Sequence, residues 1–336
     1  MKIVVDAMGG DHGVVSTVKG AIDAVNEYGV DVILVGKEGL ILEQINKYNY
    51  KGQKIKIVNA DEIITNEDKP VKAIRNKKNS SIVIGMQLVK DGEGDAFISA
   101  GNTGAVLTGG LFVVGRIKGI DRPAIAPVYP CEKGPSILLD AGANADCKAK
   151  YLQQFAIMGS VYANKILDID NPKVGLVNIG TEKGKGNELV KEAYDLIENS
   201  DVNFSGNIEA RDVPKGIVDV MVCDGFVGNT ILKLSEGLAK TLFSQLKDVF
   251  LSSIKTKLAA LMLKSGLKKL KNSFDYSEYG GALLIGLKSP VIKAHGSSNP
   301  KAIKNAIRQA KQIIDKKVVD IIKDEIEYLN NSKDNV

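Results

Sequence analysis

The stretch from Asp219 to Thr230 reads DVMVCDGFVGNT, in which a short apolar run gives way to glycines and polar residues. Its apolar part, from Val220 to Cys223, has the composition of a buried strand. The run stops at an Asp-Gly pair, and a long helical segment is expected from Thr230. In α/β proteins, polar loops of this kind follow the carboxyl ends of parallel strands, where ligands bind. The stretch therefore predicts an α/β fold with a site at this loop.

Asn229 is the last residue before that expected helix, and it is well placed as the N-cap. The free N–H groups at the start of a helix attract anions, and the neighbouring glycines let the backbone approach a ligand closely. The alternative is an ordinary strand-to-helix turn that Asn229 caps without any chemistry. Both interpretations stay open on this stretch alone.

The composition is that of an ordinary globular protein. The chain has 336 residues, 44% of them hydrophobic and 25% charged, and a formal net charge of +5. No run of 18 or more apolar residues suggests a membrane span. The N-terminal MKIVVDAMGGD is interrupted too early by Asp6 to be a signal peptide, so it predicts a first strand. We expect a cytoplasmic protein.

Residue content disfavours nucleic-acid binding and metal sites. Trp is absent and the lysines are not interleaved with aromatic residues, which does not favour a nucleic-acid partner. The histidines are His12 and His295, and the cysteines are Cys131, Cys147 and Cys223. Two histidines are too few for a multi-histidine centre, and the cysteine spacing fits neither a CxxC site nor a disulfide framework. We expect no metal.

The common nucleotide motifs are also missing. No GxGxxG follows the first strand, which argues against a dinucleotide cofactor. In the segment Gly180–Lys185, Lys185 occupies the place of the second P-loop glycine. We therefore expect no cofactor, and an anion bound without a nucleoside.

Apolar runs rich in β-branched residues recur along the chain. They are Ile3–Val5, Val32–Val35, Ile55–Val58, Ala96–Ile98, Ile137–Leu139, Val174–Val177 and Val218–Cys223. Helical patterns lie between most of them, at Val15–Tyr28, Gly39–Tyr48, Ser81–Asp91, Ala149–Leu167 and Glu188–Asn199. This alternation predicts a three-layer α/β/α fold with a mostly parallel sheet. Because no repeat or low-complexity linker occurs, we expect one domain over residues 1–336.

Small-residue loops follow many of these runs. They are Asp6–Asp11, Ser99–Gly104, Asp140–Asn144, Asn178–Gly186 and Asp224–Asn229. If all the strands belong to one parallel sheet, these loops meet at one edge and form a crevice rich in backbone N–H groups. Such a crevice suits a phosphate-type anion. The alternative is a set of unrelated turns, since Gly-Asn and Asp-Gly are ordinary turn residues.

The segment from 242 to 275 predicts a basic amphipathic helical excursion. Its apolar stripe is Phe243, Leu246, Phe250, Ile254, Leu258, Leu261 and Met262, and its lysines are Lys255, Lys257, Lys264, Lys268, Lys269 and Lys271. No acidic residue lies between Leu251 and Phe274. Such a segment suits an anionic membrane surface or an acidic partner. The alternative is a helical hairpin that packs on the core or on a second subunit.

The chain closes with a helical pattern from Pro300 to Asn330. Asn299 is a good N-cap, and proline suits the first helical position because its missing N–H is not needed there. We expect a closing helix over this range.

With these loops in view, the sequence closely resembles the bacterial phosphate acyltransferase (PlsX) family. The shared motifs are DAMGGD (6–11), RNKKNSS (75–81), SAGNTGA (99–105), DAGAN (140–144), NIGTEKGKG (178–186), GNIEARD (206–212), DGFVGN (224–229), YGGALLIG (279–286) and KAHGSS (293–298). They occur in order over nearly the whole chain. Accidental similarity does not produce so many ordered motifs.

The resemblance implies an enzyme that makes acyl phosphate from long-chain acyl-[acyl carrier protein] and inorganic phosphate, at the start of bacterial phospholipid synthesis. It implies a homodimer with a fold similar to the isocitrate and isopropylmalate dehydrogenases and to phosphotransacetylase. It also implies peripheral association with an anionic membrane. There, a glycerol-3-phosphate acyltransferase would use the product.

This reaction needs little from side chains. The leaving thiol has a pKa near that of cysteine, about 8.5, and phosphate is already an anionic nucleophile. The demands are to bring the anion to the carbonyl and to stabilise the oxyanion, so no covalent acyl-enzyme is required. We assign the neutralising charge to Lys185 and oxyanion donation to Asn229. His295 either protonates the thiolate or only donates a hydrogen bond, with a structural role as the alternative.

The remaining contacts are assigned in two groups. Phosphate and substrate binding is assigned to Asp6, Gly9, Gly10, Asp11, Gly101, Asn102, Thr103, Gly104, Asn144, Asp224 and Gly225. Membrane or carrier contact is assigned to Leu258, Leu261, Met262, Lys264 and Lys268.

Two other classes of protein are kept as alternatives for the function. One is an NAD- and metal-dependent 2-hydroxy acid dehydrogenase on a related fold, and the other is a non-catalytic membrane scaffold.

Overall fold

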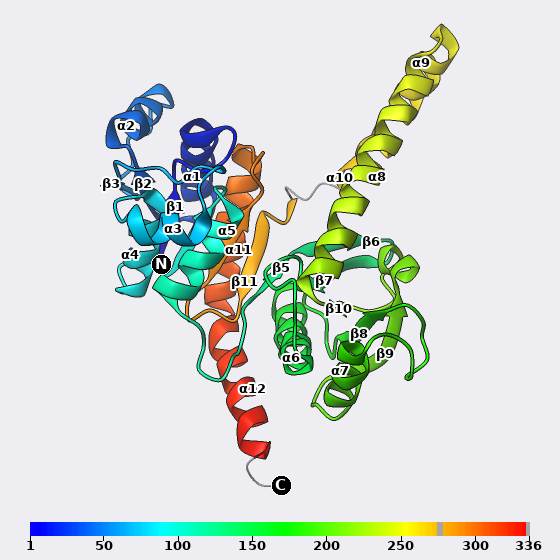
Figure 1. Cartoon of the computed structure of the whole chain (residues 1–336). Coiled ribbons are helices and arrows are strands. Elements are labelled where there is room, and N and C mark those ends of the chain that lie inside the picture. Colours follow the sequence, from blue (N-terminus) through cyan, green and yellow to red (C-terminus); the bar gives the residue numbers. More distant parts are fainter. Residues whose placement is uncertain (274–277, 334–336) are drawn as a thin grey trace.

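The computed structural model describes residues 1–273 and 278–333 (Figure 1). The strands are β1 (Lys2–Asp6), β2 (Asp31–Gly36), β3 (Ile55–Asn59), β4 (Ala96–Ser99), β5 (Ala124–Ala126), β6 (Val128–Cys131), β7 (Gly134–Leu139), β8 (Lys173–Asn178), β9 (Asn203–Glu209), β10 (Val220–Val222), β11 (Gly281–Ile285) and β12 (Val291–Ala294). The helices are α1 (Gly13–Tyr28), α2 (Glu38–Lys47), α3 (Pro70–Asn76), α4 (Ser81–Lys90), α5 (Thr103–Gly109), α6 (Ala149–Ile166), α7 (Glu188–Glu198), α8 (Gly225–Leu251), α9 (Ile254–Met262), α10 (Lys264–Ser273), α11 (Pro300–Asp315) and α12 (Val318–Lys333). A π-helical turn, η1 (Gly110–Val114), and a 3-10 turn, η2 (Ala210–Lys215), complete these elements.

The described strands form two sheets, whereas the alternation of elements predicts one. The first sheet has the order β3-β2-β1-β4-β12-β11-β5, and the second has the order β6-β7-β10-β8-β9. Strand β11 pairs antiparallel with β12 and β5, β6 pairs antiparallel with β7, and the other neighbours are parallel. The mostly parallel α/β fold is thus confirmed. The sequence pattern does not indicate the division into two sheets, because strands and helices alternate in the same way in the segments that form each sheet.

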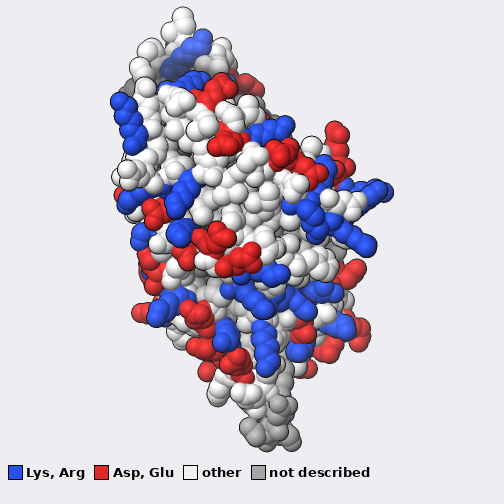
Figure 2. Space-filling model, turned by 90° about the vertical axis from the view of Figure 1, so that its left-hand side faces the viewer, with Lys and Arg blue, Asp and Glu red and all other residues white. Residues whose placement is uncertain are grey.

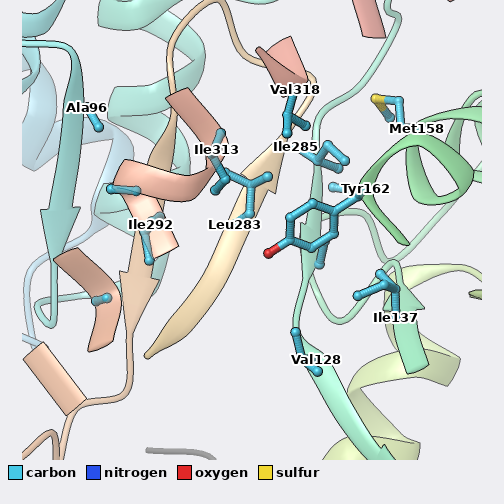
Figure 3. Packing of buried hydrophobic residues seen from close by; sticks show 14 of the residues in the cluster. Ala96, Val128, Ile137, Met158, Tyr162, Leu283, Ile285, Ile292, Ile313 and Val318 are labelled. Carbon is cyan, nitrogen blue, oxygen red and sulfur yellow. The ribbon is translucent and has the colours of Figure 1, made fainter. Parts of the chain in front are cut away.

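One apolar core joins the two sheets. Buried residues from the strands of both sheets and from α1, α6 and α11 belong to a single cluster. Figure 3 shows Tyr162 of α6 between Leu283 of β11, in the first sheet, and Ile137 of β7, in the second. The Tyr162 hydroxyl accepts a hydrogen bond of 2.7 Å from Nε2 of Gln309 on α11. This shared core holds the loops of the two sheets in a defined relation.

The helix after β10 begins five residues earlier than the sequence predicts. It starts at Gly225, and the Asp224 carboxylate accepts a hydrogen bond of 2.8 Å from the Val227 N–H. Aspartate is among the strongest N-caps, which explains why the helix begins directly after Asp224. The prediction that Asn229 caps this helix is therefore wrong. Asn229 lies inside α8, one turn beyond its start.

The closing segment consists of two helices, where the sequence predicts one. The predicted cap is confirmed, since the Asn299 side chain accepts a hydrogen bond from the Ala302 N–H at 2.9 Å. Helix α11 ends at Asp315, and α12 begins at Val318. Between them Lys317 has a φ of 52°, a left-handed conformation that ends a helix. Glycine is the usual residue at such a position, so a lysine there gives no sequence signal.

The part of α8 from residue 242 onward, together with α9 and α10, corresponds to the predicted excursion (Figure 1). Helix α8 has 27 residues, which makes it about 40 Å long, and its outer part projects away from both sheets. None of the residues of α9 is buried. The predicted excursion ends at residues 274 and 275, which lie outside the described residues. Within the described ranges, no helix is long and apolar enough to span a membrane.

The face that carries α2 and α4 has charges of both signs. Figure 2 shows Lys and Arg interspersed with Asp and Glu over this face. Mixed charges of this kind produce no strong field of one sign.

Candidate active site

The loops after β1, β4 and β12 interlock at the carboxyl edge of the first sheet. A Cβ on Gly9 would lie 2.5 Å from the Gly101 nitrogen, so only glycine lets these two loops meet. Gly10 has a φ of 86°, which favours glycine. The Asp11 N–H donates to the Gly296 carbonyl oxygen at 2.7 Å. These contacts position Gly296, which lines the cavity described below.

Asp6 lies beneath these loops, with only 2% of its surface exposed. Its carboxylate accepts hydrogen bonds from the Ser99 hydroxyl at 2.7 Å and from the Met8 N–H at 3.0 Å. Burial raises the pKa of the Asp6 carboxyl, against the lowering effect of these hydrogen bonds. Asp6 is therefore placed to hold the loops, and its oxygens are already occupied by partners within the chain.

Asn102 and Thr103 begin α5. The Asn102 side chain accepts from the Ala105 N–H at 2.9 Å and donates to the Thr65 carbonyl at 3.0 Å. A Cβ on Gly104 would lie 2.5 Å from Cγ of Pro70, so Gly104 allows α5 to pack against α3. Thr103 is exposed and lines the cavity. Of these residues, Thr103 is the one positioned to meet a ligand.

The loop after β7 is organised around Asp140, which is fully buried. Its carboxylate accepts from the N–H groups of Ile125 at 2.8 Å and Asn144 at 2.7 Å. Burial raises the pKa of the Asp140 carboxyl. The Gly225 N–H donates to the Asn144 carbonyl at 2.7 Å, and a Cβ on Gly228 would lie 1.9 Å from the Asp140 carbonyl oxygen. Asn144 and Gly225 thus seat the start of α8 on this loop.

A cavity of about 680 Å³ lies between residues of the two sheets and α8. Its polar and charged lining includes Thr103, Glu132, Asn229, Lys233, Ser235, Glu236, Lys293 and His295. Its apolar lining includes Ile125, Pro127, Val128, Tyr129, Leu232, Ala239, Leu270, Tyr279 and Ala282. Of the five loops predicted to meet, three contribute a lining residue, Thr103, Ala141 and Asn229, whereas loops 6–11 and 178–186 contribute none. This cavity is the candidate active site.

Asn229 reaches the cavity from α8, and it lies beside the loop after β7. A Cβ on Gly142 would be 3.5 Å from the Asn229 Cβ, so the two elements are in contact there. Asn229 is exposed and lines the cavity, which leaves its amide accessible to a ligand. The structure thus brings Asn229 together with Thr103 and His295.

His295 follows β12 and is partly buried. The Ser297 N–H donates to Nδ1 of His295 at 3.1 Å, and the Ser297 hydroxyl lies 2.8 Å from the same nitrogen. Burial lowers the pKa of His295, and the charges of Lys233 and Lys293 act in the same direction. An imidazole that accepts at Nδ1 is neutral and carries its proton on Nε2. Of the two roles considered for His295, hydrogen-bond donation is the one this arrangement favours.

Lys293 is a site residue that the sequence did not single out. It points into the cavity from β12 with only 9% of its surface exposed. Its Nζ donates to the carbonyl oxygens of Ala294 and of Ala100, the latter at 3.4 Å. Burial lowers the pKa of Lys293 to about 8, against the opposing charge of Asp6. A signal was present, since a lysine inside the apolar run PVIKA is unusual for a central strand.

The loop from Asn178 to Gly186 does not line the cavity. Lys185 on this loop is exposed, and its carbonyl oxygen accepts from the Asn178 side chain at 3.0 Å. Lys183 pairs instead with Asp195 and Glu198. Lys185 is therefore not among the residues that line the cavity with Asn229 and His295. The lysines that line the cavity are Lys233, paired with Glu236 at 2.9 Å, and Lys293.

The residues assigned to membrane or carrier contact lie on the excursion. Leu258, Leu261 and Met262 of α9 are 60%, 66% and 86% exposed, and Lys264 and Lys268 of α10 are also exposed. Leu270 of α10 lines the cavity, so the excursion and the candidate active site meet at this residue.

No cluster of histidine, cysteine or carboxylate side chains able to hold a metal ion occurs in the part of the chain that the structure describes.

A family model described as a fatty acid synthesis protein matches residues 1–321. The phosphate acyltransferase of Alkaliphilus oremlandii (strain OhILAs) is 57% identical over 333 residues, which cover 99% of each chain. The phosphate acyltransferase of Clostridioides difficile (strain 630) is 52% identical over 336 residues, which cover 100% of this chain and 99% of that relative.

Solved structures share the fold at low sequence identity. A phosphotransacetylase from Streptococcus pyogenes has a TM-score of 0.65 and 21% identity, with 94% of each chain covered. A 4-hydroxythreonine-4-phosphate dehydrogenase from Klebsiella pneumoniae has a TM-score of 0.52 and 11% identity, with 93% of this chain and 99% of that chain covered. The expected likeness to the phosphotransacetylase and dehydrogenase folds is confirmed, and so is the expectation of an acyltransferase of lipid synthesis. The chain belongs to the fatty acid synthesis protein family, whose members at this level of identity are phosphate acyltransferases.

Proposed function

We propose that this enzyme transfers a long-chain acyl group from acyl-[acyl carrier protein] to inorganic phosphate. The observation that carries this proposal is the cavity, which combines a long apolar lining with Thr103, Asn229, Lys293 and His295. Its volume of about 680 Å³ suits a small-molecule ligand, for which about 300–1,000 Å³ is typical. Each methylene of an acyl chain buried there contributes about 0.8 kcal/mol to binding.

In this proposal, phosphate attacks the thioester carbonyl directly. Thr103 and the backbone around it donate to the phosphate, and Lys233 and Lys293 supply positive charge along the same cavity. Lys185 stays a proposed source of neutralising charge, which requires the loop 178–186 to move towards the cavity. Asn229 donates to the oxyanion, and the neutral His295 donates from Nε2. Preorganised donors of this kind each contribute about 3 kcal/mol where they have been removed by mutation.

A direct assay tests the reaction. Purified protein is incubated with palmitoyl-[acyl carrier protein] and phosphate, and acyl phosphate is trapped with hydroxylamine as the hydroxamate. We expect hydroxamate that depends on enzyme, phosphate and acyl donor together. If an acyl donor of proven activity gives no hydroxamate above the reaction without phosphate, the proposal is wrong.

The two alternatives are not favoured by the comparisons, since the relatives that match nearly the whole chain are phosphate acyltransferases. The dehydrogenase alternative predicts reduction of added NAD by a 2-hydroxy acid. The scaffold alternative predicts no turnover of acyl-[acyl carrier protein] at all. The same assay, run with NAD and candidate acids in parallel, separates the three.

We also propose that α9 and α10 attach the enzyme to an anionic membrane from the cytoplasmic side. The support is an exposed apolar group, Leu258, Leu261 and Met262, next to exposed Lys264 and Lys268. Basic amphipathic helices bind anionic lipid surfaces through this combination. Product released there reaches a membrane glycerol-3-phosphate acyltransferase directly.

Lysines near the cavity also steer the acidic carrier protein, so the rate with acyl-[acyl carrier protein] should fall as the salt concentration increases.

A homodimer is proposed from an exposed stripe on α8. Leu234, Leu238 and Leu242 are each more than half exposed and lie four residues apart along the helix. Residues spaced in this way share one helix face, which a second copy of the helix can cover. Light scattering of Leu234→Asp/Leu238→Asp should give a monomer where the wild type gives a dimer. A dimer of unchanged mass in this variant would remove the stripe from the interface.

A further inference from the structure

Supplying positive charge to the cavity does not by itself explain why Lys293 is buried. It is 9% exposed, it lines the cavity, and among the described residues it forms no ion pair. Its two acceptors are the backbone carbonyls of Ala100 and Ala294. An ammonium group has three donors, so one N–H is left to meet a ligand in the cavity. A charged lysine in such a setting is costly and therefore suggests a function.

We propose that Lys293 is the general acid that protonates the departing thiolate of the acyl thioester. This inference rests on the proposed function. An oxygen of HPO₄²⁻ forms a bond to the carbonyl carbon, and the bond from carbon to sulfur breaks. The ammonium of Lys293 gives its proton to the thiolate sulfur. The neutral amine then takes the remaining proton from the phosphoryl group of the product, which restores the ammonium, so the overall products are acyl phosphate dianion and free thiol.

The surroundings of Lys293 match this task. Burial lowers its pKa to about 8, and this is near the value of about 8.5 for a thiol, so proton transfer is close to balanced. The charged groups that act on it are Asp6 below the β1 loop, Asp11 on that loop, and Lys233 on α8. Asp6 and Asp11 raise the pKa and Lys233 lowers it. A bound phosphate dianion also favours the ammonium, so the group is charged when the complex forms.

His295 is less suited to the same role. Its Nδ1 accepts from the Ser297 N–H at 3.1 Å, so the ring is neutral and holds a proton only on Nε2. A neutral imidazole is a very weak acid, although it is a good hydrogen-bond donor. Glu236 on α8 favours the imidazolium, but burial, Lys233 and Lys293 together lower the pKa of His295. The geometry thus assigns proton donation to the lysine and hydrogen-bond donation to the histidine.

The principal test is the pH profile of kcat/KM for phosphate, with palmitoyl-[acyl carrier protein] as donor. We expect the wild-type value to fall above pH of about 8, where Lys293 loses its proton. Lys293→Arg keeps a charge that does not titrate in this range, so the fall should disappear while kcat drops about 100-fold. Lys288→Met, which changes an exposed lysine of the loop before β12, is the control and should keep both rate and profile.

A second test varies the leaving group. Lys293→Met and the wild type are compared with the alkyl thioester of the carrier and with a palmitoyl aryl thioester, whose thiol is far more acidic. An aryl thiolate leaves without a proton, so the variant should lose about 100-fold with the carrier thioester and less than about 5-fold with the aryl thioester. Equal losses with both donors would mean a structural role.

Failure of this inference differs from failure of the proposed function. If the wild type makes no acyl phosphate, the function itself is wrong. If the wild type is active, but folded Lys293→Arg and Lys293→Met retain near-normal kcat or the wild-type alkaline fall, the acid is another group. Circular dichroism and thermal melting of each variant show whether the fold is intact.

Discussion

The cavity and the helical excursion are built in opposite ways. Around the cavity, the loops fix one another through close backbone contacts, such as Gly9 against Gly101 and Gly228 against Asp140. Along the excursion, α9 has no buried residue, and Leu261 and Met262 are 66% and 86% exposed. The first region is determined by contacts within the chain. The second offers an apolar surface that only something outside the chain can cover.

This difference shows where stability and function reside. The loops around the cavity must keep donors in place, so a change of one methyl group there should disturb both fold and activity. The excursion has few contacts to lose, so substitutions there should leave the fold intact and change only what the enzyme attaches to. Leu270 lines the cavity from α10 and is the point where the two regions meet.

The largest effect is expected from Gly228→Ala. The added Cβ would lie 1.9 Å from the Asp140 carbonyl oxygen, so α8 must move away from the loop after β7. We expect a loss of about 4 kcal/mol or more in the free energy of unfolding, measured by urea denaturation, together with loss of activity. The matched control is Gly237→Ala in the same helix, where a Cβ meets no atom within 4 Å. It should stabilise by about 1 kcal/mol, and equal effects of the two changes would contradict the interlocked start of α8.

The next effect concerns Lys293 and pH. The pKa of this lysine is lowered to about 8 in the folded state from 10.5, so the unfolded chain holds its proton to higher pH. The cost of burying the ammonium is present in full below pH of about 8 and disappears as pH rises towards about 10.5. Relative to Lys293→Met, the wild type should therefore gain up to about 3 kcal/mol in unfolding free energy over this window. Urea denaturation at several pH values measures this, and a pH-independent difference would mean that the lysine is not desolvated.

A smaller effect is expected from the oxyanion donor. Asn229→Ala should lower acyl phosphate formation at least about tenfold with the fold intact, because its amide lines the cavity. Lys185→Ala should do the same if its loop reaches the bound phosphate. The hydroxylamine assay measures both. If Lys185→Ala has a near-normal rate and Asn229→Ala is impaired, the neutralising charge comes from Lys233 and Lys293. If both variants have near-normal rates, the roles assigned to Lys185 and Asn229 are both wrong.

The smallest effect on stability is expected on the excursion. Replacing Leu258, Leu261 and Met262 by Ser should change the unfolding free energy by less than about 0.5 kcal/mol per site, since each is exposed. The same variant should no longer sediment with anionic vesicles, because the apolar face that enters the lipid is lost. Glu substitutions at Lys264 and Lys268 test the basic part of the contact. Unchanged sedimentation of the Ser variant would assign this surface to a protein partner instead.

Much of the secondary structure could be predicted from the sequence. Each predicted strand and helix is present, because local periodicity and turn residues decide these elements within a few residues. Strands β5, β6, β9, β11 and β12 were not predicted, since several are short and lack a β-branched run. The prediction that Asn229 rather than Asp224 caps α8 was wrong. Asparagine and aspartate are both good N-caps, and the helix begins after Asp224, which comes first in the chain.

The candidate site was predicted only in part, because local sequence patterns show which loops follow strands but not which side chains line a cavity. Glycine-rich loops after strands predicted a site at the strand ends, and Thr103, Asn229 and His295 do line one cavity. Lys293 was missed, although it stands in an apolar strand, because sequence does not show which face of a strand borders a cavity. Lys185 was chosen for its place in a glycine-rich loop, and the structure puts that loop outside the cavity lining.

The sequence by itself therefore determined the α/β class, the strand-end loops, the cap at Asn299, and the amphipathic excursion. These features depend on residues close together in the chain. Only the tertiary structure decided that the strands divide into two sheets, that the cavity lies between them, and that a lysine from β12 is buried in its wall. Those outcomes depend on contacts between residues far apart in sequence, whose pairing no local pattern specifies.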